Sequence, residues 1–257
     1  MFIDAHAHLN DDRLYANASD VIKRAKENGV EIIINAGSDL ISSTRAVELA
    51  EKFPECYAVI GVHPENPQDY NDEMESFLLN QKDNPKVLAI GEIGLDYHYE
   101  GYDKNLQKEV FLKQLILADK MGLPIVIHSR DATGDMLQML KDNKHLLKNR
   151  GLLHCFSGSQ ETLNEVLKLG FIVSFGGVVT FKNSKNAGEL LKNISLDSFI
   201  LETDCPYLCP EPYRGQTNEP KYIPIIAQKI SEIIGVNIQE IQEKTTKNVK
   251  KLFKRLK

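Results

Sequence analysis

Imidazole and carboxylate side chains recur in this sequence at the ends of short apolar segments. His6 and His8 follow the first such segment, Glu92 ends a later one, and Asp204 follows the last. Five of the seven histidines occupy such positions: His6, His8, His63, His128 and His154. Nitrogen and oxygen donors of these types bind divalent metals in proteins. The residue types therefore indicate a metal centre, provided that the fold brings these segment ends together.

The strongest local signal is the pair His6 and His8, which are separated by one alanine. In an extended chain, residues i and i+2 point to the same side, so both imidazoles can face one ion. On its own, the pair is equally compatible with two partly exposed histidines. Several imidazoles and carboxylates gathered in a confined site without a cation would lose hydration with little compensation. The donors at the other segment ends therefore favour a metal site.

Six candidate ligands are more than the four that one tetrahedral zinc ion uses, whereas two ions bridged by a carboxylate would use them all. The predicted assignment is His6, His8 and Asp204 on one ion, His128 and His154 on the other, and Glu92 between the two. Mixed nitrogen and oxygen donors fit Zn²⁺, Mn²⁺ or Ni²⁺, or Mg²⁺ with additional waters. The sequence therefore predicts two divalent cations without selecting the metal.

Two such ions, about 3.5–4 Å apart, lower the pKa of a shared water toward about 7 and neutralise charge on the group under attack. Asp204 can orient that water and accept its proton, a role compatible with metal binding. His63 could donate a proton or contact the substrate, although a structural histidine is an alternative. The predicted catalytic residues are therefore Asp204, Glu92 and His63, and the reaction is hydrolysis of a phosphoester, an amide or an ester.

Three polar residues are predicted to bind the substrate. Arg130 lies two residues after His128 and could clamp a phosphate with its planar guanidinium, unless it pairs with a nearby carboxylate. Arg214 and Asn218 lie in the Pro/Gly-rich loop 206–220, which is long enough to fold over the site. An ordinary surface connection is the alternative for that loop.

Other reactive side chains near the predicted ligands receive different roles. Glu202 shares a strand face with Asp204, so we expect it to orient a ligating histidine rather than bind a metal. Cys155 and Cys205 each adjoin a proposed ligand and are expected to point away from the ions on a strand-like backbone. His98 is not expected to bind a metal.

These residues need a framework that brings distant segment ends to one place. Short segments rich in isoleucine and valine begin about 28 residues apart on average, close to the length of about 30 residues for one βα unit. Their apolar residues do not alternate with polar ones, as expected for strands buried on both faces. The segments are 2–4, 31–36, 57–62, 87–92, 124–128, 151–154, 171–174 and 199–203.

Helical patterns lie between these segments, including one expected over 135–148. The pattern predicts an α/β chain that forms a closed (β/α)8 TIM-type barrel, with residues 1–257 as a single domain. An open doubly wound sheet is compatible with the same periodicity. In either architecture the functional residues belong at the C-terminal ends of the strands.

Length and composition exclude several classes of protein. The chain has 257 residues and a net charge of −5, so overall charge does not hold it on nucleic acid. No apolar run approaches the about 18 residues of a membrane helix, and no secretory signal is visible at the N-terminus. Four scattered cysteines favour a reducing compartment. We expect a cytoplasmic monomer without membrane association or an obligate protein partner.

Eight ordered motifs make the sequence similar to the TatD family of metal-dependent deoxyribonucleases, a branch of the amidohydrolase-like barrels. The resemblance covers essentially the whole chain, and the joint order of the motifs is highly specific. The motifs are DAHAHL (4–9), GVHP (61–64), GEIGLDY (91–97), PIVIHSR (124–130), HCFSG (154–158), SFGGVVTF (174–181), LETDCPYL (201–208) and NEP (218–220).

The resemblance implies a TIM-type barrel, two divalent ions on the six ligands already assigned, and 3′→5′ exonuclease or related activity on DNA and sometimes RNA. One departure is visible, because members often carry a second histidine just after the His-Pro pair where this chain has Glu65. That difference puts a phosphate contact at this position in doubt and leaves the predicted ligands intact.

Two other functions remain compatible with the sequence. The first is an amide or ester hydrolase of the same superfamily, such as a cyclic amidase or an aminoacyl-tRNA deacylase. Many such barrels bridge their metals with a carboxylated lysine on the fourth strand, whereas this chain offers Glu92, which leans toward phosphoesters. The second is a non-catalytic metal-dependent scaffold, and retention of every predicted ligand argues against it. The leading hypothesis is a two-metal nuclease acting on free ends of DNA.

Overall fold

The computed structural model describes residues 1–256, and its framework is a ring of eight parallel strands. Neighbours in the ring follow the chain order from β1 to β8. The strands are β1 (Phe2–Ala7), β2 (Val30–Ala36), β3 (Cys56–Ile60), β4 (Val87–Asp96), β5 (Ile125–Arg130), β6 (Gly151–Leu153), β7 (Ile172–Phe175) and β8 (Phe199–Leu201). The arrangement confirms the predicted (β/α)8 barrel.

Backbone hydrogen bonds join the first strand to the segment that follows the last. The N–H of Asp204 donates to the carbonyl of His6 at 2.9 Å, and the N–H of His8 donates to the carbonyl of Cys205 at 2.7 Å. These bonds place residues from opposite ends of the sequence side by side.

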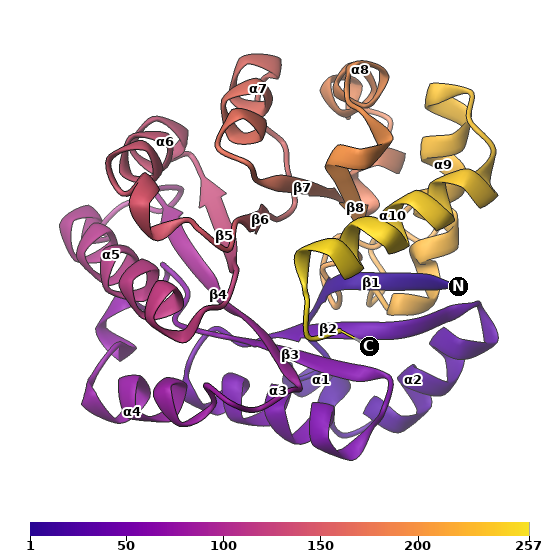
Figure 1. Cartoon of the computed structure of the whole chain (residues 1–257). Helices are drawn as coiled ribbons and strands as arrows, with labels where there is room; N and C mark the ends of the chain where they lie inside the picture. Colours follow the sequence, from indigo (N-terminus) through magenta and orange to yellow (C-terminus); the bar gives the residue numbers. More distant parts are fainter. Residues whose placement is uncertain (257) are drawn as a thin grey trace.

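Helices surround the strands (Figure 1). They are α1 (Asp12–Tyr15), α2 (Ala18–Glu27), α3 (Leu40–Lys52), α4 (Asp72–Asn80), α5 (Lys104–Met121), α6 (Thr133–Asp142), α7 (Gln160–Lys168), α8 (Lys185–Asn193), α9 (Ile223–Ile234) and α10 (Ile238–Leu252). Short 3₁₀ turns occur at 67–69, 144–146, 177–180, 196–198 and 220–222. None of the helices within residues 1–256 is both long enough and apolar enough to cross a membrane.

Two apolar layers hold the barrel together. The larger layer lies between the strands and the surrounding helices. The smaller layer includes Ile34, Val59 and Val126 from the strands, together with Leu252 and Phe253 at the end of α10. The fully buried Phe253 therefore belongs to the core shared by the strands, and α10 crosses in front of them in Figure 1. Burial of such aromatic side chains is a main source of stability in cores.

Several predicted boundaries are wrong by two or more residues, and three of them bear on the site or its surroundings. β4 continues four residues past Glu92 to Asp96, and its pairing with β5 shifts register between Ile90 and Ile93. β3 ends at Ile60, so His63 lies in the following loop. The helix expected over 135–148 is α6 followed by a separate 3₁₀ turn. The glycines of β4 allow the backbone of the neighbouring strand to come close. The spacing of apolar residues does not predict such a close approach.

Candidate active site

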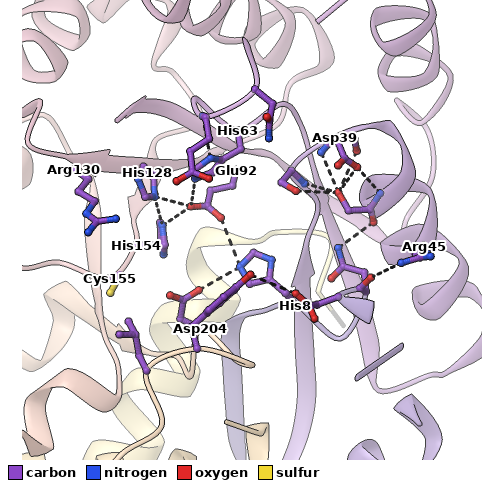
Figure 2. A pocket seen from close by; sticks show the side chains of 18 of the residues that line it. His8, Asp39, Arg45, His63, Glu92, His128, Arg130, His154, Cys155 and Asp204 are labelled. Carbon is purple, nitrogen blue, oxygen red and sulfur yellow. Dashed lines mark hydrogen bonds and ion pairs between the residues drawn. The ribbon is translucent and has the colours of Figure 1, made fainter. Parts of the chain in front are cut away.

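A cavity of about 800 Å³ opens at the C-terminal ends of the strands. Its wall includes side chains that lie on or follow seven of the eight strands, and Figure 2 shows them converging from several sides. Of the six predicted metal ligands, five line the cavity: His8, Glu92, His128, His154 and Asp204. The sixth, His6, is 1% exposed and contacts this group from below the surface. The fold therefore brings all six side chains to one place.

One oxygen of the buried Glu92 carboxylate faces the residues from β1 and β8. Glu92 Oε2 lies 3.2 Å from His6 Nε2 and 3.7 Å from His8 Nε2. The two histidine Nε2 atoms are 3.2 Å apart, and Asp204 Oδ1 lies 3.2 Å from His8 Nε2. These four residues form the first donor group, the same set that the sequence assigns to one ion together with the bridge.

The other Glu92 oxygen faces a second set of imidazoles. Glu92 Oε1 lies 2.6 Å from His154 Nε2, 2.9 Å from His128 Nδ1 and 3.3 Å from His63 Nε2. The facing nitrogens of His128 and His154 are 3.3 Å apart. These residues form the second donor group. Each Glu92 oxygen therefore faces a different donor group, as expected for a carboxylate between two ions.

Hydrogen bonds on the far side of two histidine rings determine which nitrogens are free to bind a cation. His8 Nδ1 lies 2.8 Å from the carbonyl oxygen of Ala36, and His128 Nε2 lies 2.8 Å from Asp96 Oδ2. A carbonyl or carboxylate oxygen accepts hydrogen bonds, so these nitrogens are the donors. With the hydrogens held on these outer nitrogens, His8 Nε2 and His128 Nδ1, which face Glu92, are the atoms that would lose a hydrogen to bind a cation.

His63 differs from these two histidines. The backbone N–H of Glu65 donates to His63 Nδ1 at 3.2 Å, so the Nδ1 atom is the acceptor and Nε2 carries the hydrogen in the neutral ring. A nitrogen that binds a metal must be unprotonated. In this tautomer His63 Nε2 donates toward Glu92, and the same nitrogen lies close enough to Glu92 and His128 to share an ion with them once its hydrogen is lost.

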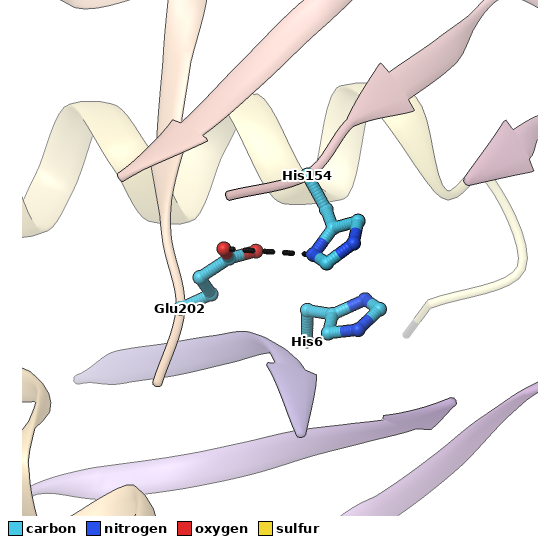
Figure 3. A group of neighbouring side chains, drawn as sticks. All are labelled: His6, His154 and Glu202. Carbon is cyan, nitrogen blue, oxygen red and sulfur yellow. Dashed lines mark ion pairs between the residues drawn. The ribbon is translucent and has the colours of Figure 1, made fainter. Parts of the chain in front are cut away.

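Glu202 is held in place behind His154 and His6 (Figure 3). Its carboxylate accepts hydrogen bonds from Ser174 Oγ at 2.5 Å and from the backbone N–H of Cys155 at 2.7 Å. Glu202 Oε1 also lies 3.8 Å from His154 Nδ1, and the rings of His6 and His154 stack with centroids 4.1 Å apart. Because both carboxylate oxygens already accept hydrogen bonds, Glu202 fits a positioning role.

Charges in the cluster shift the pKa values of its members in opposite directions. Burial alone would raise the pKa of Glu92, but the imidazoles of His154, His63 and His6 hold it well below its usual value. Burial alone would lower the pKa of His154, but Glu92 and Glu202 raise it well above its usual value. Burial and the neighbouring His154 lower the pKa of His6.

The donor set fits divalent cations. The Nε2 atoms of His6 and His8 lie 3.2 Å apart and 3.2–3.7 Å from the oxygens of Glu92 and Asp204. Groups of imidazole and carboxylate donors around Glu92 lie close enough to share an ion. Such mixed nitrogen and oxygen donors suit Zn²⁺, Mn²⁺ or Ni²⁺.

The three predicted substrate-binding residues lie in different places. Arg130 lines the cavity at the end of β5. Arg214 does not line it, and its exposed guanidinium lies 4.2 Å from the centre of the Phe181 ring. Asn218 is fully buried, and its amide donates to the carbonyls of Thr203 and Tyr207 at 2.8 and 2.6 Å. The structure therefore brings Arg130 to the site and leaves Arg214 and Asn218 outside its wall.

Both cysteines were expected to point away from the ions on a strand-like backbone. Cys205 is buried and does not line the cavity, but for Cys155 the expectation is wrong. Cys155 lines the cavity, because its backbone has φ of 46° and is not strand-like. Burial raises the pKa of the Cys155 thiol well above its usual value, and Glu202 and Asp204 raise it further. The thiolate that a nucleophile requires is therefore disfavoured.

Sequence reasoning gave no role to several residues of the site, among them Asp96 and Arg45. Asp96 contacts His128, and Arg45 of α3 lines the cavity with an ion pair to Asp12 at 2.6 Å. The alternation of Glu92, Gly94 and Asp96 along one extended strand is a signal that could have revealed Asp96. No local sequence pattern indicates that Arg45 belongs to the site, because its position depends on how α3 packs beside the barrel.

Comparison with known proteins agrees with this geometry. The family model for TatD-related DNases matches residues 3–254. The chain belongs to this family. The metal-dependent hydrolase YabD of Bacillus subtilis, whose own function is uncharacterized, is 44% identical over 254 residues that cover 99% of each chain. The 3′-5′ ssDNA/RNA exonuclease TatD of Erwinia tasmaniensis is 31% identical over 97% of this chain and 98% of its own.

Solved structures give the same result for the fold. The crystal structure of YjjV, a TatD homologue from Escherichia coli, superposes with a TM-score of 0.93 at 28% identity and covers 98% of both chains. This TatD-family protein is thus a metal-dependent hydrolase with a barrel fold and clustered histidines and carboxylates that could bind metal ions.

Proposed function

We propose that this TatD-family hydrolase cleaves phosphodiester bonds at free 3′ ends of DNA, with RNA as a further substrate, using two divalent cations. The observation that carries the proposal is the division of donors between the two oxygens of Glu92. The proposed ligands are His6, His8 and Asp204 on one side, His128 and His154 on the other, and Glu92 between them. The name of the Erwinia tasmaniensis relative supports a nucleic-acid substrate and degradation in the 3′→5′ direction.

The bound cations would acidify a water molecule and screen the negative charge of the phosphodiester. Asp204 directs Oδ1 toward His8, and we propose that its Oδ2 accepts the proton of the attacking water. His63 carries a hydrogen on Nε2 and would donate it to the leaving oxygen. The guanidinium of Arg130, on the cavity wall, would hold a non-bridging phosphate oxygen.

The test uses metal-stripped protein reloaded separately with Mg²⁺, Mn²⁺, Zn²⁺ or Ni²⁺. Single-stranded DNA labelled at its 5′ end should shorten stepwise from the 3′ end. Glu92→Gln should lower the rate by about 10²–10³-fold, the size of effect seen when one electrostatic group of a catalytic site is removed. The matched control is His145→Ala, which changes an exposed histidine in the turn after α6.

Two outcomes would contradict the proposal. Intact DNA and RNA with every metal would exclude the nuclease activity. Cleavage of an aminoacyl ester or a cyclic amide instead would assign the same centre to ester or amide hydrolysis.

A further inference from the structure

The wall of the cavity carries an aromatic ring that none of the proposed chemical steps uses. Tyr207 follows β8, lines the cavity and is 48% exposed. Its ring centroid lies 6.2 Å from that of His8, with the two ring planes at 77°. Tyr207 is therefore a direct neighbour of the first donor group, and much of its surface remains open to a ligand.

Backbone hydrogen bonds fix the position of Tyr207. Its N–H donates to the carbonyl of Asp204 at 3.0 Å. Its own carbonyl accepts a hydrogen bond from the buried Asn218 amide at 2.6 Å. The backbone carbonyl of Leu208, the next residue, packs against Gly177. A Cβ added at Gly177 would lie 2.0 Å from the Leu208 carbonyl oxygen. These contacts hold the backbone of Tyr207 and Leu208 in place and so set where the ring leaves the chain.

A cation supports the ring from the β1 side. The Cζ atom of Arg13 lies 4.4 Å from the ring centroid of Tyr207, within the range of a cation–π contact. Asp11 holds the guanidinium through two hydrogen bonds of 2.8 and 2.9 Å and also lies 3.4 Å from the tyrosine hydroxyl. The ring is thus supported by a charged group that is itself oriented.

We infer that Tyr207 and Arg13 form a nucleobase subsite, in which a base of the substrate strand stacks on the exposed part of the tyrosine ring. This inference rests on the proposed function, because it places the phosphate of the bound nucleotide at the donor groups around Glu92. Stacking of a base on an aromatic side chain tolerates every sequence, since each base has a π face. The subsite would therefore bind nucleotides without selecting their sequence.

The direct test is a binding titration that requires no turnover. The probes are the 5′-monophosphate of 2-aminopurine deoxyribonucleoside, whose fluorescence falls when the base stacks, and deoxyribose 5-phosphate, which has no base. Binding to magnesium-loaded protein is expected to quench the nucleotide. Tyr207→Ala should raise its Kd by about 5- to 150-fold, the range for loss of one base–aromatic stack. The Kd of deoxyribose 5-phosphate should not change.

Matched variants separate stacking from structural effects. Tyr207→Phe keeps the ring and should bind the nucleotide like the wild type. Tyr213→Ala removes an exposed tyrosine that lies outside the cavity wall and should also have no effect. Tyr207→Leu, which keeps apolar bulk without an aromatic face, should reproduce the weaker binding and serves if the alanine variant does not fold.

The outcomes distinguish this inference from the proposed function. Equal nucleotide affinity for the wild type and Tyr207→Ala would overturn the subsite, even if the wild type degrades DNA. Equal affinity of the wild type for the nucleotide and for deoxyribose 5-phosphate would overturn it as well. Absence of DNA cleavage by the wild type would overturn the proposed function, while the titration would still report whether a base stacks on Tyr207.

Discussion

His128 Nε2 lies 2.8 Å from Oδ2 of the buried Asp96, on the opposite side of the ring from the nitrogen that faces Glu92. The side chain of Asp96 is 0% exposed, and its Oδ1 accepts a hydrogen bond from the backbone of His98 at 2.9 Å. This pair fixes both the ring orientation and the tautomer of His128. Such carboxylate partners behind ligating histidines raise metal affinity and are sensitive to mutation.

Replacing Asp96 should therefore weaken the proposed metal site at His128 and His154 selectively. We expect Asp96→Asn to lower the affinity for one of two ions by about 10–100-fold. The neutral amide lacks the negative charge that holds the hydrogen on His128 Nε2 and leaves Nδ1 to bind the ion. Competition with a chelator of known affinity measures both binding steps. Asp131→Asn is the control, since Asp131 pairs with the exposed His98. Two unchanged affinities in Asp96→Asn would refute the positioning role.

Removal of metal should lower thermal stability. The donor groups come together only in the folded chain, so free metal at about 100 times its Kd stabilises the protein by about 2.7 kcal/mol. For a chain of this size that corresponds to a rise in Tm of about 5–10 °C on reloading the chelated protein. Differential scanning calorimetry checks the shift, which should shrink in Glu92→Gln. An equal shift in that variant would mean that the metal binds elsewhere.

Asn218 should matter for stability more directly than for substrate binding. We expect Asn218→Ala to reduce the free energy of unfolding by about 2–4 kcal/mol, because it leaves two carbonyls without their donor in a buried place. Urea denaturation measures the change. Asn186→Ala is a matched control, because Asn186 also donates to backbone carbonyls but is exposed, and should cost less than about 0.5 kcal/mol. A similar cost for both variants would contradict this interpretation.

Gly94 should tolerate no side chain. Its φ is 143°, and an added Cβ would lie 2.0 Å from the carbonyl oxygen of His128. We expect Gly94→Ala to destabilise the fold by about 3 kcal/mol or more and to displace His128. The control Gly134→Ala in α6 meets nothing within 4 Å and should stabilise the chain by about 0.5–1 kcal/mol. Thermal melts of both variants check this, and a stable Gly94→Ala with normal metal binding would contradict it.

The sequence by itself determined the repeated strand–helix units and the types of donor at the C-terminal ends of the strands, whereas closure into a barrel was decided by the tertiary structure. Apolar segments that do not alternate with polar residues are expected for strands covered on both faces, and eight such segments at regular spacing predicted the eight parallel strands. His6 and His8 flank Ala7 at the end of β1, so their convergence could be predicted from local geometry alone.

Only the tertiary structure decided which atoms of these donors face one another and which residues support them. The two oxygens of Glu92 face different histidines, which come from strands far apart in the sequence, so the contacts of each oxygen have no local sequence signal. Asn218 was predicted to face the substrate, yet its amide serves buried carbonyls, since an unpaired carbonyl inside the protein is costly. Local patterns fix residue types and periodicity, whereas the partner of each polar atom depends on contacts between distant segments.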